Sequence, residues 1–212
     1  MDAEQTIEHI KKKYNLIIDE RTVYPIPLPM GKHYCLPTMF AELGFTKGAE
    51  VGVYKAMFSI ELMKGIPNLH LIGVDLWKIY PGYKDFGSND IDEAYKISKE
   101  IYDSYGDRAV LLKGDSVDLA KTIPDGSLDF VFIDANHNYE HVVADIAAWA
   151  PKVRKGGIVS GHDYNDYAMR IKWASMHVVD AVNGWTRSYR IKPWFITTQN
   201  RNNCWFYVKT WK

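Results

Sequence analysis

Polar residues fall at the carboxyl ends of five apolar segments of this chain. The first four segments end on Glu50, Asp75, Asp115 and Asp134, and the fifth ends on His162-Asp163. In an open parallel α/β sheet, the carboxyl ends of the strands lie along one edge, and ligands bind at that edge. One acid at a strand end is a coincidence, but polar residues at all five ends predict a binding site.

The first of these segments runs into a glycine turn, Glu50-Val51-Gly52-Val53-Tyr54-Lys55-Ala56. At Gly52 the backbone can pass close to a ligand where a Cβ would collide. The turn lacks the second glycine of Gly-x-Gly-x-x-Gly, and Glu50 puts a negative charge near the place of a pyrophosphate, which argues against a dinucleotide. An adenosine ligand that carries an ammonium group suits Glu50 better, and S-adenosylmethionine is one. The alternative is a generic strand–turn–helix with a chance acid.

The next two strand ends supply groups for the rest of such a ligand. Asp75 lies about two dozen residues past Gly52, where a carboxylate can accept hydrogen bonds from both hydroxyls of a ribose. Asp115 and Ser116 follow the third segment and can meet the amino group and ring edge of an adenine. The alternative for each of these residues is a helix N-cap, which Asp and Ser often provide at such junctions.

The elements that must position these residues are five strand–helix units. Residues 128–133 form a near-continuous apolar run, typical of a strand buried on both faces of a parallel sheet. Residues 194–198 and 205–209 flank a polar turn and predict an antiparallel hairpin. The sum is an α/β, Rossmann-like, doubly wound fold with a mostly parallel seven-stranded sheet that ends in the hairpin. Helices are expected at residues 2–14, 36–43, 90–105 and 168–182, besides those that follow the strands.

Composition narrows the class of protein. The 212 residues carry 26 Lys+Arg and 26 Asp+Glu, so net charge gives no reason to expect nucleic acid or a membrane as partner. Cys35 and Cys204 stand in no metal-type spacing, and no apolar run approaches a membrane span of about 18–20 residues. We expect a cytoplasmic protein with one domain over residues 33–212, and an N-terminal arm over residues 1–32 that packs on it.

Four segments together carry a resemblance to a known family. They resemble class I S-adenosylmethionine-dependent methyltransferases, and most of all the small-domain group called methyltransferase family 24. The similarity covers about residues 35–210, and the order and spacing of the four segments make it specific. Ala56 departs from that family's pattern, which usually has glycine there. The segments are Glu50-Val51-Gly52-Val53-Tyr54-Lys55-Ala56, Val74-Asp75-Leu76-Trp77, residues 132–139 and residues 156–164.

The resemblance implies a cofactor site made of residues from these segments. It places Asp75 at the ribose, Asp115 and Ser116 at the adenine, and Asp134 under the methyl-donor end. The cofactor-binding residues that it implies are Glu50, Gly52, Tyr54, Asp75, Leu76, Asp115, Ser116 and Asp134, with Glu50 and Gly52 near the methionine part.

The chain also resembles the metal-dependent O-methyltransferases of the catechol and macrolide-sugar types. That likeness implies a divalent metal at Asp134, His162 and Asp163, with Asp134 and His137 as catalytic residues and His137 as the base. An imidazole with a pKa near 6.5 can accept a hydroxyl proton. Histidine is a softer ligand than a carboxylate, so Mn²⁺, Fe²⁺ and Zn²⁺ are as well suited as Mg²⁺. The alternative for both histidines is a structural hydrogen bond.

Further residues could shape the site for the methyl acceptor. The aromatic loop 77–83, Tyr164, Tyr167 and Trp185 could cover an acceptor, although each alone is more often a packing residue. His141 is expected to face solvent on its helix.

These features favour a methyltransferase that acts on an oxygen of a small molecule, with or without metal assistance. A nicotinamide (NAD)-dependent oxidoreductase and an adenosyl-ligand-binding module without turnover are the alternatives. The acceptor is left open, and so is a homo-oligomer.

Overall fold

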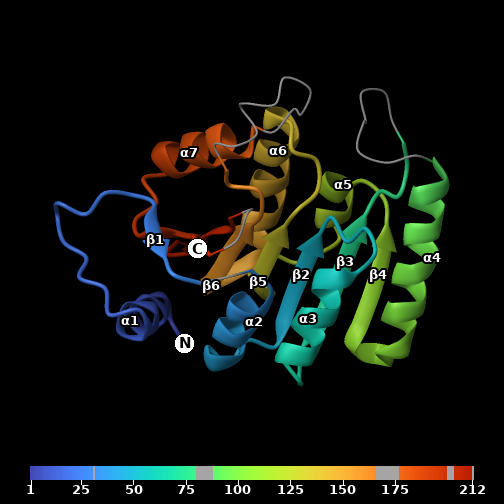
Figure 1. Cartoon of the computed structure of the whole chain (residues 1–212), viewed down its shortest axis with the longest axis horizontal. Coiled ribbons are helices and arrows are strands. Elements are labelled where there is room, and N and C mark those ends of the chain that lie inside the picture. The colour runs from blue at the N-terminus through green and yellow to red at the C-terminus, as the bar shows by residue number, and fades with distance from the viewer. Residues whose placement is uncertain (31, 80–87, 166–176, 200–202, 212) are drawn as a thin grey trace.

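The elements alternate between helix and strand along most of the chain (Figure 1). The computed structural model describes residues 1–30, 32–79, 88–165, 177–199 and 203–211. The helices are α1 Ala3–Lys13, α2 Lys32–Glu42, α3 Met57–Gly65, α4 Ser88–Ser104, α5 Ser116–Ala120, α6 Tyr139–Trp149 and α7 Val178–Ser188. The strands are β1 Ile26–Leu28, β2 Lys47–Val51, β3 His70–Asp75, β4 Ala109–Lys113, β5 Leu128–Ile133, β6 Val153–Gly161, β7 Trp194–Thr197 and β8 Trp205–Val208.

All these strands form one sheet in the order β1-β7-β8-β6-β5-β2-β3-β4. Every neighbouring pair is parallel except the two that involve β8, which runs antiparallel to β6 and β7. The predicted fold class, with its terminal hairpin, is therefore confirmed. The order in which the chain adds strands reverses between β5 and β2, which are neighbouring parallel strands near the middle of the sheet. Such folds open a ligand crevice at this switch point.

The described sheet has eight strands and not the seven expected, because β1 adds an edge strand. β1 pairs in parallel with β7, with Ile26 opposite Phe195. This strand was not predicted because the segment is rich in proline, which cannot donate a hydrogen bond to a neighbouring strand. Proline is nevertheless tolerated in an edge strand such as β1. β1 thus belongs to the sheet although it lies within residues 1–32. The domain boundary at residue 32 stays a prediction.

The N-terminal helix is fastened to the same sheet. Asp2 and Gln5 form a reciprocal capping box at the start of α1. The Thr6 hydroxyl donates a hydrogen bond of 2.9 Å to the carbonyl of Gly156 in β6. Gly156 has a φ of +83°, and a Cβ there would lie 2.8 Å from backbone atoms of residues 1 and 2. This close approach explains the glycine in mid-strand.

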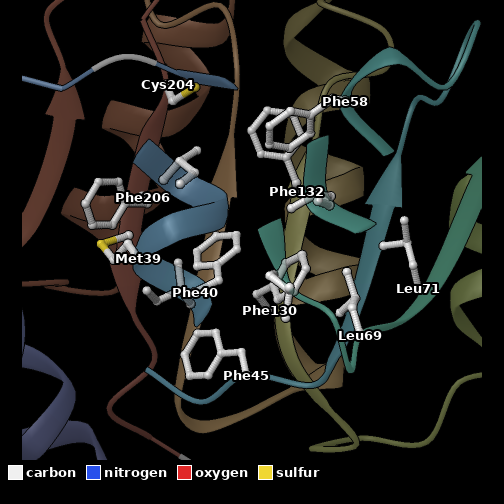
Figure 2. Close-up of a cluster of buried hydrophobic side chains, with 14 of the residues drawn as sticks. Met39, Phe40, Phe45, Phe58, Leu69, Leu71, Phe130, Phe132, Cys204 and Phe206 are labelled. Atoms are coloured by element: carbon white, nitrogen blue, oxygen red, sulfur yellow. The ribbon is translucent and has the colours of Figure 1, made fainter. Parts of the chain in front are cut away.

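Hydrophobic side chains cover both faces of the sheet. One core gathers residues of α1 to α4 and the other gathers residues of α5 to α7, and β5 contributes to both. Figure 2 shows the first core, where Phe130 of β5 stacks on Phe40 of α2 with ring centroids 4.4 Å apart. A Cβ at Gly48 of β2 would lie 2.1 Å from the Phe130 ring, so this strand needs glycine there. The central strands are therefore held firmly, which fixes the positions of their carboxyl ends.

The predicted helices at 2–14, 36–43 and 90–105 match α1, α2 and α4 within a few residues. The helix expected at 168–182 lies partly outside the described residues, and the part that is described begins at Val178 and continues to Ser188. Among the described residues, no helix has the length and apolar character that crossing a membrane would require.

Candidate cofactor and metal site

A cavity of about 520 Å³ opens at the carboxyl ends of β2 to β5. This size falls within the range of small-molecule sites, about 300–1,000 Å³. The structure brings to it all the predicted cofactor-binding residues and the predicted base, namely Glu50, Gly52, Tyr54, Asp75, Leu76, Asp115, Ser116, Asp134 and His137. His162 and Asp163 do not line this cavity but contact Asp134 from the end of β6. The sequence pattern thus predicted where this cavity lies, while binding of a ligand by these residues stays a prediction.

The glycine turn forms the floor of the cavity at the end of β2. Gly52 has a φ of +91°, and a Cβ there would lie 2.1 Å from the carbonyl oxygen of Asp134. Its own amide donates to the carbonyl of Val74 at 2.8 Å. Ala56 is fully buried at the start of α3 with a φ of +59°, a left-handed conformation that glycine adopts more readily. Ala56 therefore keeps the backbone shape of the turn at a cost of about 1–2 kcal/mol.

Asp75 holds this turn in place. Its Oδ2 accepts hydrogen bonds from the amides of Val53 and Tyr54, at 3.0 and 2.9 Å, and its Oδ1 accepts one from the amide of Trp77 at 2.9 Å. An ionised carboxylate offers about four acceptor positions, so three are used by the protein. Contact with a ribose stays a prediction for Asp75, and the structure adds a positioning role that the sequence did not reveal.

Glu50 is almost completely buried beneath the cavity, with 2% of its surface exposed. The hydroxyl of Ser59 donates a hydrogen bond to its Oε2, and that hydroxyl lies 3.0 Å from the hydroxyl of Tyr102 on α4. Burial, and then the charge of Glu50, raise the pKa of Tyr102 well above its usual value, so its hydroxyl keeps its proton. A Cβ at Gly73 would lie 2.1 Å from that hydroxyl, which explains the glycine within β3.

Asp115 is the N-cap of α5, as the alternative interpretation had it. Its Oδ1 accepts hydrogen bonds from the amides of Val117 and Asp118, both at 3.0 Å. The hydroxyl of Ser116 donates to Oδ1 of Asp145 on α6. Both residues still line the cavity, so contact with an adenine stays a prediction.

Sequence reasoning missed Asp145, which lines the cavity with only 4% of its surface exposed. A signal for it was present: Asp145 stands three residues after Val142 and four before Trp149, on the apolar stripe of the predicted helix. His141 is exposed, as expected, and it also lines the cavity.

Two histidines and two aspartates converge beside the cavity. His137 Nε2 lies 3.1 Å from Asp163 Oδ2 and 3.6 Å from Asp134 Oδ1. His162 Nδ1 lies 3.2 Å from Asp163 Oδ2 and 3.5 Å from Asp134 Oδ2. Asp163 is buried and has a φ of +56°, a conformation in which Asp and Asn are enriched.

The charges of this cluster alter its protonation. Burial lowers the pKa of His137, but the carboxylates of Asp134 and Asp163 outweigh it and raise the pKa to about 10. Burial raises the pKa of Asp163, but His137 and His162 outweigh it and lower the pKa to about 2. His137 is therefore protonated at neutral pH in this arrangement, unlike the unperturbed imidazole that the sequence led us to expect.

The predicted metal ligands fit a divalent cation. One ligand atom from each of Asp134, His162 and Asp163 can be chosen so that all three lie within 4.8 Å of one another. Oδ1 of Asp163 is buried and has no hydrogen-bond partner among the described residues. One imidazole with two carboxylates is a donor set that suits Mn²⁺, Fe²⁺ or Zn²⁺ as well as Mg²⁺.

The aromatic residues proposed to cover the acceptor have hydrogen-bond partners within the protein where they are described, and Trp77 also lines the cavity, so contact with an acceptor stays a prediction. Trp77 is buried, and its Nε1 donates to the carbonyl of Tyr54 at 3.0 Å. Trp185 donates to the hydroxyl of Tyr207 at 3.0 Å, and Tyr164 donates to Oδ1 of Asn183 at 2.9 Å. Tyr167 and residues 80–83 lie outside the described residues.

Solved structures with the same fold include several methyltransferases. The O-methyltransferase from Bacillus cereus in complex with SAH (S-adenosylhomocysteine) gives a TM-score of 0.62 at 15% identity, over 98% of this chain and 90% of that one. The SAH-bound methyltransferase PaMTH1 from Podospora anserina gives 0.61 at 15% identity, over 82% and 76%. Cofactor-bound Rv0187 from MTB gives 0.62 at 16% identity, over 98% and 90%. At these identities the likeness establishes the fold alone.

Sequence comparison gives a short relative and a longer family match. Uncharacterized protein R132 of Acanthamoeba polyphaga mimivirus is 40% identical over 62 residues, which make up 29% of this chain and a quarter of that protein's length. The family model described as "Methyltransferase domain" matches residues 49–164, from the glycine turn to the residue after Asp163. This match covers more than half of the chain and includes the cavity and the histidine–aspartate cluster. The chain therefore belongs to this methyltransferase family.

Proposed function

We propose that the protein is an S-adenosylmethionine-dependent methyltransferase that acts on an oxygen atom of a small molecule. The observation that carries the proposal is the cavity over the glycine turn, where Gly52 leaves no room for a Cβ and Glu50 is buried below. The carboxylate of Glu50 favours a ligand with a positive charge in this cavity. The SAH named for two structural neighbours supports the same cofactor.

When bound, S-adenosylmethionine supplies a methyl group on a positively charged sulfonium, which is already a strong methyl donor. The chain therefore has to bind and align more than it has to activate. Asp75 fixes the turn through Val53 and Tyr54, and Ser59 fixes the Glu50 carboxylate, so both groups are preorganised. In-line placement of an acceptor oxygen against the methyl group supplies much of the rate.

Asp134 and His137 both line the cavity, and in the proposed reaction the acceptor oxygen would lie beside them. Asp134 joins the cavity to the cluster with His162 and Asp163, so it is placed both to hold a cation and to orient the acceptor. A divalent cation at Asp134, His162 and Asp163 would supply Lewis-acid chemistry to that oxygen. His137 keeps its proton while it faces both carboxylates, so its proposed role as base requires these contacts to change when ligands bind.

Calorimetry with S-adenosylhomocysteine and with NAD tests the cofactor. We expect saturable one-to-one binding of S-adenosylhomocysteine and no binding of NAD, because Glu50 lies near where a pyrophosphate would sit and the second glycine is absent. Binding of NAD without binding of S-adenosylhomocysteine would support an oxidoreductase and overturn the proposal.

Turnover of small hydroxylated acceptors, measured with and without a chelator, tests the reaction. We expect methyl transfer that falls when the chelator removes divalent metal. Undiminished turnover in chelator would exclude the metal role. Binding of the cofactor product without turnover of any acceptor would instead favour a binding module.

A further inference from the structure

The cavity contains the carboxylate of Asp145, which was not among the predicted cofactor-binding residues. Asp145 on α6 lines the cavity near the end of β4, where its Oδ1 accepts the hydrogen bond of Ser116. Helices α5 and α6 pack against each other, which brings this acid to the end of the cavity predicted for the adenine. A buried acid at a ligand cavity needs a partner, because an unpaired buried charge is costly.

The other two polar residues at this end already have protein partners. Asp115 caps α5, because its Oδ1 accepts hydrogen bonds from the amides of Val117 and Asp118. The hydroxyl of Ser116 donates its hydrogen bond to Oδ1 of Asp145. Among the described residues, Ser116 is the hydrogen-bond partner of Asp145, through Oδ1, which leaves Oδ2 able to accept from a ligand.

The surroundings of this carboxylate suit a flat base. Leu76, Val117 and Ala144 line the same cavity with apolar side chains. A planar ring that binds among such side chains loses its contact with water. A hydrogen bond at the edge of the ring then contributes more to discrimination between ligands.

We infer that Asp145 accepts a hydrogen bond from the 6-amino group of the cofactor's adenine and thereby selects 6-aminopurines over 6-oxopurines. The inference rests on the proposed cofactor and adds a residue that decides its specificity. A carboxylate oxygen accepts a hydrogen bond from a 6-amino group. A 6-oxo group is itself an acceptor, so the two oxygens would face each other without a hydrogen bond between them. Ser116 positions the carboxylate through its hydrogen bond to Oδ1.

The protonation of Asp145 makes this selection dependent on pH. Burial raises the pKa of Asp145 to about 6, and the charge of Asp115 raises it as well. The hydrogen bond from Ser116 and the charge of His141 act in the opposite direction and lower this pKa. His141 reaches it from its own helix and Asp115 from the start of α5, while Asp75 and Lys78 line the cavity at the end of β3. Above pH 6 the carboxylate accepts from the base, and below pH 6 its protonated form can also donate to a 6-oxo group.

Calorimetry with S-adenosylhomocysteine and S-inosylhomocysteine tests the inference, since the second ligand replaces the 6-amino group with an oxo group. At pH 8 we expect the native protein to prefer the adenosyl ligand by roughly 10-fold to 100-fold, as for loss of a hydrogen bond to a charged group. In Asp145→Asn the preference should fall to within about threefold, because an amide both donates and accepts. The native preference should shrink at pH 5, and that of Asp145→Asn should not.

Asp118→Asn is the matched control, because it removes an exposed acid of α5 that pairs with Lys121 outside the cavity. Its preference should equal that of the native protein. An unchanged preference in Asp145→Asn, with S-adenosylhomocysteine still bound, would overturn the inference and leave the proposed function standing. Should Asp145→Asn not fold, the pH series on the native protein decides, and a preference that is constant from pH 5 to 8 would overturn the inference. Failure of the native protein to bind S-adenosylhomocysteine would count against the proposed function itself.

Discussion

Replacing Gly52 with alanine should abolish binding of S-adenosylhomocysteine and destabilise the fold. The new Cβ would lie 2.1 Å from the Asp134 carbonyl oxygen and 2.4 Å from its carbon, both backbone atoms that cannot rotate away. The φ of +91° adds strain for any residue with a side chain. Relief requires β2 and β5 to separate at the cavity floor. We expect a loss of more than about 3 kcal/mol in the free energy of unfolding, measured by urea denaturation.

Gly106→Ala is the control for backbone conformation alone. Gly106 also has a positive φ, +56°, but nothing lies within 4 Å of a Cβ placed there. This variant should lose only about 1 kcal/mol and bind the ligand as the native protein does. Equal losses in the two variants would show that the left-handed conformation, and not the close approach to Asp134, makes Gly52 necessary.

The sequence predicted the place of the cavity because the polar residues that follow apolar strands are a local feature of the chain. An apolar run followed by a polar residue is visible in a single segment, and parallel topology then brings all such ends together. Gly52 was predicted to let the backbone approach a ligand, and the structure adds a reason that the sequence did not show, because the backbone of Asp134 passes close to it.

Roles that depend on partners distant in the chain could not be predicted in this way. That Asp75 fastens the turn became visible only once Val53 and Tyr54 lay beside it. The raised pKa of His137 depends on Asp134, three residues away in the chain, and also on Asp163, which lies at another strand end. β1 was missed because its prolines oppose a strand, and only the free edge of β7 makes it favourable.

The acids of the cavity share a feature that connects stability with function. Glu50, Asp75 and Asp145 each accept a hydrogen bond from the protein, from Ser59, from backbone amides and from Ser116. Each is therefore fixed before a ligand arrives, and binding loses less conformational freedom than it would with mobile side chains. The same contacts lessen the cost of burying the carboxylates of Glu50 and Asp145.

Asp163→Asn should destabilise the metal-free protein by about 3 kcal/mol at pH 6 and by much less at pH 10. Asparagine keeps the shape and accepts the φ of +56°, so the change isolates the charge. The pKa of His137 is raised from 6.5 to about 10 in the fold, so its pairing stabilises fully below pH 6.5 and is lost as the pH rises through 10. The pKa of Asp163 is lowered from 3.8 to about 2, so its contribution is present above pH 3.8 and lost as the pH falls through 2. Removing the carboxylate therefore costs most between these limits, by the order of a broken buried pair.

Urea denaturation in chelator at pH 6, 8 and 10 measures this dependence. Asp103→Asn serves as control, because Asp103 pairs with Lys99 at the exposed surface and should leave the free energy of unfolding nearly unchanged. An equal cost for Asp163→Asn at pH 6 and pH 10 would show that its charge does not stabilise the imidazolium of His137. Added Mn²⁺ or Zn²⁺ separates the two roles of this residue, since a cation that binds the folded protein raises its stability. The native protein should gain stability from the metal and Asp163→Asn should gain much less, because the amide offers a neutral ligand where the cation needs a carboxylate.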